Sequence, residues 1–125
     1  MVEVEVSNLT QAQVDEAGAV DVAQRVLAAE GVEDGEIGIL FVPPDRIAEL
    51  KREYLGLHEA TDVLAFPIDG RGELPEGVPR QLGDVVLCPE VVRESWRAPL
   101  VHGLLHLLGY DHGTKMQARE RLHAR

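Results

Sequence analysis

Three of the five histidines of this 125-residue chain lie in one short apolar stretch, HGLLHLLGYDH at 102–112. His102 and His106 are four residues apart on a predicted helix, so they share one face with Cβ atoms about 5–6 Å apart. Gly109 predicts a left-handed exit from that helix, after which His112 returns to the same face. Three neutral imidazoles at this spacing predict one metal ion, zinc above all, with a fourth coordination position left open.

The alternative interpretation is a packing role, in which the histidines hydrogen-bond to the backbone. Three histidines together with the turn glycine favour the metal. The pattern H-x-x-x-H-x-x-G-x-x-H has the spacing of the metzincin zinc proteases. Those proteases place their general base, a glutamate, directly after the first histidine, and this chain has Gly103 there. The spacing therefore indicates a metal-dependent hydrolase and disfavours a peptidase.

The surrounding sequence predicts the elements that must position these histidines. Apolar or alternating runs predict strands at 2–6, 36–42, 61–67 and 82–89. Caps and prolines predict helices at 10–30 with Thr10 as its cap, 45–56, 89–96, 99–109 and 114–125. Glycines and prolines predict a loop at 67–80. The order predicts a single α+β domain over residues 1–125, with a mixed sheet of about four strands packed with helices and the metal site on the C-terminal helix and following turn.

Charge and cysteine content limit the class of protein. The net charge is -10, with nineteen acidic and six basic residues in 1–90 but three acidic and six basic residues in 91–125. The histidines thus lie in the locally basic part of the chain, although a simply solvated acidic surface gives the same counts. A single cysteine, Cys88, excludes an intrachain disulfide and suits a reducing compartment. With an acidic, alternating N-terminus and no apolar run of membrane-spanning length, we expect a cytoplasmic protein without membrane partners.

The stretch at 102–112 closely resembles the signature of the YbeY endoribonucleases, which are bacterial ribosomal-RNA maturation factors. TDVLAFP (61–67) also fits the family, and LGDVVLCPEVV (82–92) is similar to the family's fourth strand and the helix that follows it. The resemblance implies a zinc-dependent hydrolase that prefers single-stranded RNA. It implies roles in maturing the 3′ end of small-subunit ribosomal RNA and in ribosome quality control, with the small ribosomal subunit or its factors as partners. His102, His106 and His112 fall on the family's zinc ligands, which implies one zinc per chain.

Two departures from the family pattern have expected consequences. The family often carries YRG where this chain has YLG, so Leu55 replaces an arginine thought to face the substrate phosphate. We expect this replacement to weaken phosphate binding and to slow cleavage of isolated RNA. The spacer before the histidine helix is shortened to SWRAPL (95–100), which indicates a trimmed fold that keeps the metal site.

Other polar residues are weaker candidates. His58 could act as an acid, a base or an RNA contact, or be an exposed loop histidine. Asp111 could orient a ligand imidazole or merely cap a turn. We assign both to catalysis as a hypothesis. Basic residues that could contact RNA phosphates, each of which could instead be a solvated helix charge, are Arg93, Arg97, Lys115 and Arg119.

The sequence therefore predicts a metal-dependent endoribonuclease that cleaves phosphodiester bonds in ribosomal RNA. Two functions of other kinds stay open at this point. One is a ribosome assembly factor without enzymatic activity, in which zinc is mainly structural. The other is a metal-dependent hydrolase of a different ester or amide.

Overall fold

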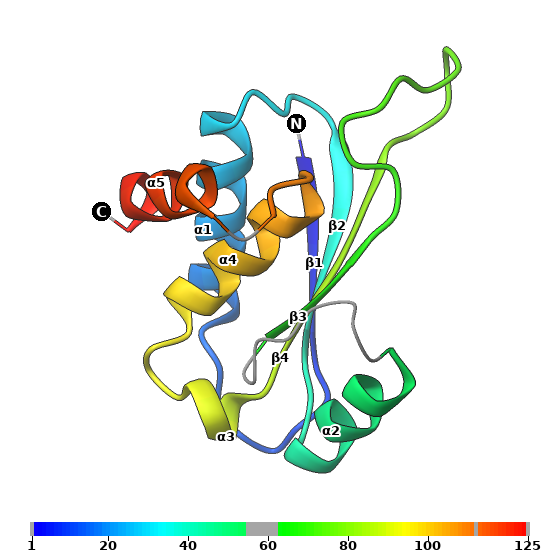
Figure 1. The fold of residues 1–125 in the computed structure, drawn as a ribbon. Coiled ribbons are helices and arrows are strands. Elements are labelled where there is room, and N and C mark those ends of the chain that lie inside the picture. Colours follow the sequence, from blue (N-terminus) through cyan, green and yellow to red (C-terminus); the bar gives the residue numbers. More distant parts are fainter. Residues whose placement is uncertain (1, 55–62, 112, 125) are drawn as a thin grey trace.

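The computed structural model describes residues 2–54, 63–111 and 113–124. These residues form one four-stranded sheet and five helices (Figure 1). The strands are β1 (Val2–Asn8), β2 (Gly35–Phe41), β3 (Val63–Pro67) and β4 (Gln81–Leu87). The helices are α1 (Glu16–Ala29), α2 (Pro44–Glu53), α3 (Pro89–Val92), α4 (Arg97–Leu107) and α5 (Thr114–His123). The predicted α+β class is confirmed.

The sheet is mixed, as the sequence predicts, and its strand order is β1-β2-β4-β3. Strands β1, β2 and β4 are parallel, and β3 runs antiparallel beside β4. Val4 pairs with Ile37, and Ile39 pairs with Val85, so β-branched side chains lie on the same face of neighbouring strands. Residues 68–80 join β3 to β4 without a helix or strand, which confirms the predicted loop, and they project beyond the sheet (Figure 1).

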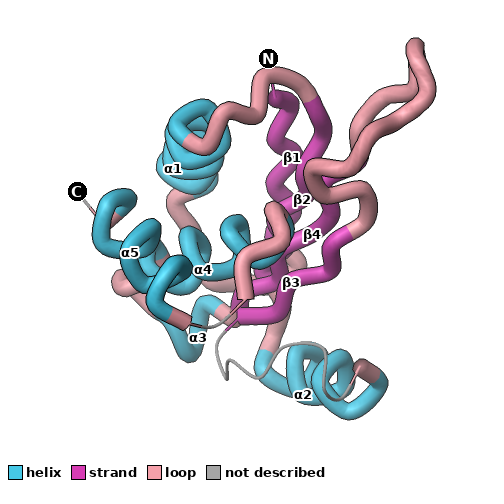
Figure 2. The backbone as a smooth tube through the Cα atoms, turned by 45° about the horizontal axis from the view of Figure 1, so that its top comes forward, coloured by secondary structure: helices cyan, strands magenta, loops and turns pink. Residues whose placement is uncertain are grey.

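Helices α1 and α4 cover one face of the sheet, and α5 lies outside them (Figures 1 and 2). Leu27 of α1, Ile39 of β2 and Leu104 of α4 are fully buried between these layers. Helix α2 packs through Ile47 against the other face, beside Val86. The predicted histidine helix is therefore sandwiched between the sheet and the C-terminal helix. No helix in the described part of the chain is both long enough and apolar enough to span a membrane.

The predicted start of the first helix is wrong. Helix α1 begins at Glu16, and the side chain of Asp15 caps it by accepting a hydrogen bond from the Gly18 N–H at 2.9 Å. Thr10, the predicted cap, belongs to a preceding turn. Its backbone N–H donates to Oδ1 of Asn8 at 3.0 Å, which closes a local Asx turn, and its hydroxyl donates to the same oxygen at 2.6 Å.

The helices before and after Trp96 also differ from the prediction. Helix α3 ends at Val92 instead of near Trp96, because Arg93 adopts φ 50° and ψ −126°, which is not helical. Helix α4 begins at Arg97, two residues before its predicted start at Pro99. Pro99 thus lies in the first helical turn, where its missing N–H removes no intrahelical hydrogen bond.

Gly103 allows α4 to approach the sheet closely. A Cβ atom at this position would lie 2.7 Å from Cγ1 of Val85 and 3.2 Å from Cγ2 of Val63. Both valines are buried and stiff about χ1, so they have little freedom to move aside. Residue 103 consequently faces the sheet, and a glutamate there could not serve as the base of a peptidase without breaking this packing.

Gly103→Ala should lower the free energy of unfolding by about 1–3 kcal/mol, because it overpacks the interface between α4 and the sheet. Helix propensity alone predicts the opposite sign, a gain of about 1 kcal/mol. Urea denaturation of both proteins measures the difference. A variant at least as stable as the wild type would contradict the close-packing argument.

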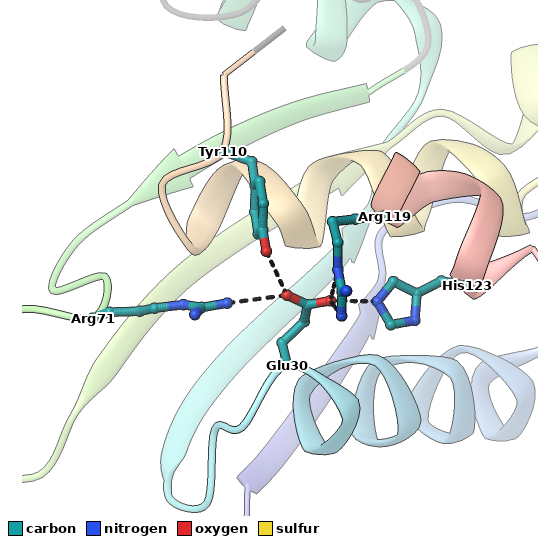
Figure 3. Close-up of polar contacts among 5 residues, drawn as sticks. All are labelled: Glu30, Arg71, Tyr110, Arg119 and His123. Carbon is teal, nitrogen blue, oxygen red and sulfur yellow. Dashed lines mark hydrogen bonds and ion pairs between the residues drawn. The ribbon is translucent and has the colours of Figure 1, made fainter. Parts of the chain in front are cut away.

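A second contact network holds α5 in place. The carboxylate of Glu30, just beyond α1, is only 2% exposed. Its Oε1 accepts hydrogen bonds from the Tyr110 hydroxyl at 2.8 Å and from Arg71 at 3.1 Å. Its Oε2 accepts from Arg119 at 2.7 Å and contacts Nε2 of His123 at 2.6 Å (Figure 3). One buried charge thus ties α1 to the loop after β3, the turn after α4, and α5.

The network changes the acidity of its central carboxyl group. Burial raises the pKa of Glu30, but hydrogen bonds from His123, Tyr110 and Arg119 and the charge of Arg119 outweigh it and lower the pKa from 4.5 to about 2. Because the folded value lies below the ordinary one, ionised Glu30 stabilises the fold at pH values above about 4.5. This contribution is lost as the pH falls toward 2.

Glu30→Gln should lower the free energy of unfolding at neutral pH by about 3 kcal/mol, because it removes the buried charge with which the partly exposed Arg71 and Arg119 pair. The difference in the free energy of unfolding between wild type and variant should shrink as the pH falls from about 5 toward 2. Urea denaturation at several pH values measures it, with the exposed Glu33→Gln as the matched control. A gap that is absent or independent of pH in this range would contradict the role of Glu30.

Candidate metal centre

Helix α4 brings together the two histidines that its sequence spaces one turn apart. The Nε2 atoms of His102 and His106 are 3.1 Å apart, and the rings meet edge to face with their centroids 4.6 Å apart. The His106 residue is 4% exposed and the His102 side chain 18% exposed. The two imidazoles therefore converge through the same ring nitrogen in a partly enclosed position.

This convergence fits a pair of metal ligands. Two nitrogen atoms bound to one tetrahedral zinc ion at 2.0–2.1 Å lie about 3.3–3.4 Å apart, close to the observed 3.1 Å. Within residues 2–54, 63–111 and 113–124, no group of three or more His, Cys, Asp or Glu side chains could hold a metal ion. The predicted third ligand, His112, lies outside those residues, so the three-histidine site stays a prediction.

One contact at this site was not predicted from the sequence. Oε2 of Glu120 on α5 lies 3.2 Å from Nδ1 of His102, the ring nitrogen that does not face His106. The Glu120 side chain is 34% exposed. Only the folded arrangement reveals this contact, because α5 must pack beside α4 to make it. The one sequence signal is that Glu120 is the single acidic residue after Asp111.

The structure places the other catalytic candidates as follows. Asp111 is exposed directly after the turn that follows α4. His58 lies outside the described residues, as does Leu55. The catalytic assignments of Asp111 and His58 thus stay predictions, and so does the effect of Leu55.

The four candidate RNA contacts come from three places in the chain, which are the residue after α3, the first residue of α4, and α5. Arg93 is exposed, and its Nε donates to the carbonyl of Glu90 at 3.3 Å. The guanidinium of Arg97 lies 4.6 Å from the centroid of the Trp96 ring. Arg97 is the first residue of α4 and precedes His106 by nine residues, about 14 Å along the helix axis, while His102 lies in the middle of the helix.

The two candidates on α5 differ from each other. Lys115 is exposed in the first turn of α5. The guanidinium of Arg119 pairs with Oε2 of Glu30, with its Nε at 2.7 Å and an amino group at 2.6 Å from that oxygen (Figure 3). His123, which its place near the end of the chain predicted to have no role, completes the same network at the end of the helix. The structure thus gives Arg119 a definite structural role, and its contact with RNA stays a prediction.

Known proteins resemble this chain over nearly its whole length. A family model described as endoribonuclease YbeY matches residues 5–125. The endoribonuclease YbeY of Mycobacterium ulcerans is 37% identical over 134 residues, which cover 94% of this chain and 75% of that protein. The one of Mycobacterium tuberculosis is also 37% identical, with 94% and 76% covered.

A solved structure shares the fold. The solution structure of TM1509 from Thermotoga maritima aligns over 96% of this chain and 85% of that chain, with a TM-score of 0.54 and 23% sequence identity. The sequence comparisons confirm the resemblance that the histidine stretch indicates. The chain belongs to the YbeY endoribonuclease family.

Proposed function

We propose that this protein is a zinc-dependent endoribonuclease that cleaves single-stranded RNA in the cytoplasm. Its substrate is ribosomal RNA, at the 3′ end of the small-subunit species, and it contributes to ribosome quality control with the small subunit or its factors as partners. Membership of an endoribonuclease family supports RNA cleavage. The single structural observation that carries the metal part of the proposal is the convergence of two imidazole Nε2 atoms at 3.1 Å.

Three histidines would hold the metal ion for such a reaction, and the packing of α4 orients two of them. His102 and His106, with His112 as the third ligand, would hold the zinc ion. Bound there, zinc supplies a Lewis acid that polarises a phosphoryl oxygen. Tight packing at Gly103 keeps the histidine helix against the sheet, and this rigidity fixes both imidazoles in one geometry.

Charge distribution supports a nucleic-acid substrate at this end of the molecule. Residues 91–125 carry six basic and three acidic residues, while the rest of the chain is strongly acidic. Lys115 is exposed on α5, next to the helix that bears the histidines. The acidic remainder of the chain repels phosphate groups, whereas the basic residues of this segment attract them. We infer that RNA approaches over α4 and α5.

The metal proposal predicts that His106→Ala loses most of its bound zinc, because one of three nitrogen ligands is removed. His58→Ala removes an imidazole outside the predicted ligand set and should keep one zinc per chain. Metal analysis of both purified variants and the wild type measures this, with circular dichroism to verify folding. Full zinc content in the His106 variant would show that the site is assigned wrongly.

The reaction proposal predicts cleavage of a labelled unstructured RNA that stops on addition of a chelator and resumes with zinc. Casein should stay intact, because residue 103 offers no base and faces the sheet. Chelator-sensitive proteolysis would overturn the reaction class. Ribosome binding without RNA cleavage would favour a structural assembly factor, and turnover of small esters without RNA cleavage would favour another kind of hydrolase.

A further inference from the structure

The two nitrogen atoms of the His102 ring face different partners. Its Nε2 lies 3.1 Å from Nε2 of His106, and its Nδ1 lies 3.2 Å from Oε2 of Glu120. The carboxylate and the second imidazole therefore lie at opposite edges of one ring. Helix α4 supplies both histidines, and α5 supplies the carboxylate.

This arrangement selects one tautomer of neutral His102. An ionised carboxylate only accepts hydrogen bonds, so the Glu120 contact requires a proton on Nδ1 of His102. The lone pair then lies on Nε2 and points toward His106. A metal ion binds the unprotonated ring nitrogen, and a carboxylate on the other nitrogen makes that ligand more basic. The tautomer favoured by Glu120 is thus the one that presents Nε2 to a metal.

We propose that Glu120 is a positioning residue that fixes the tautomer and ring orientation of His102 for metal binding. The inference rests on the proposed metal centre and adds to it a residue on a separate helix. Glu120 is not itself a ligand in this arrangement, because its carboxylate lies at the ring edge opposite the point where the two Nε2 atoms meet. It acts on the metal only through His102.

The neighbouring contacts of α5 hold Glu120 at this position. Arg119 and His123 are four residues apart on α5, and both contact the buried carboxylate of Glu30 (Figure 3). Met116, one turn before Glu120, is 1% exposed. The helix is therefore anchored on both sides of Glu120. The anchored helix makes Glu120 an oriented partner of His102, unlike a solvent-exposed ion pair with two freely moving side chains.

Zinc titration against a competing chelator tests this inference on the full-length wild type, Glu120→Ala and Glu120→Gln. Glu120→Ala should weaken zinc binding about 10- to 100-fold, as loss of such a carboxylate partner typically does. Glu120→Gln should retain most of the affinity, because its amide oxygen still accepts the Nδ1 proton. Glu94→Gln, an exposed glutamate outside the site, is the matched control and should bind zinc like the wild type.

A second measurement does not depend on metal. Nitrogen-15 NMR of the metal-free protein should show His102 protonated on Nδ1 in the wild type and in Glu120→Gln, and a mixture of tautomers in Glu120→Ala. A purely structural role of Glu120 would lower the melting temperature and leave both the tautomer and the zinc affinity unchanged.

The outcomes separate the inference from the proposal beneath it. A wild type that binds no zinc would overturn the metal centre and the positioning role together. A wild type that binds zinc with the same affinity as Glu120→Ala would overturn the positioning role and leave the metal centre standing. A weakened Glu120→Ala, rescued by glutamine and accompanied by the tautomer change, supports both.

Discussion

The burial of one carboxylate, that of Glu30, organises the part of the molecule that carries the candidate site. A charge that is 2% exposed is tolerated only when its oxygens are fully engaged. Its partners come from three segments that are all far from Glu30 in sequence, represented by Arg71, Tyr110 and Arg119. Meeting this one requirement brings the loop after β3, the turn after α4 and helix α5 together at the end of α1 (Figure 3).

The position of α5 has direct consequences for the histidines. Tyr110 is held two residues before His112, the predicted third ligand, and Arg119 is adjacent to Glu120. Helix α4 is restrained from its other side, because Gly103 leaves no space between the helix and the valines of β3 and β4. The imidazole pair thus lies on a helix fixed by close packing on one side and faced by an anchored carboxylate on the other. Rigid support of this kind is what a metal site needs from its scaffold.

Local patterns in the sequence predicted much of the fold. Apolar runs predicted the four strands, and the four-residue spacing of His102 and His106 predicted that their imidazoles converge. Each prediction needs only the regular side-chain periodicity within one strand or one helix. Helix starts were less predictable. Thr10 and Asp15 are both good caps by residue type, and only the turn closed by Asn8 decides between them. Helix α3 ends just before Arg93, which has a positive φ although it is not a glycine. The residue type therefore does not signal the end of this helix.

The contacts around the site could not be predicted for a different reason. Glu30 and His123 are 93 residues apart, and Glu120 and His102 are 18 apart. No periodicity links such pairs, because they meet only once α1, α4 and α5 have packed. The phosphate contacts and the roles of His58, Leu55 and His112 stay predictions that rest on family resemblance and spacing.

X-ray absorption at the zinc edge of the purified protein tests the central claim most directly, since it reports the ligands themselves. We expect a shell of nitrogen or oxygen atoms at about 2.0–2.1 Å, with outer-shell scattering from three imidazole rings. A sulfur shell at about 2.3 Å, or an oxygen-only environment without imidazole scattering, would contradict a metal centre built from His102, His106 and His112.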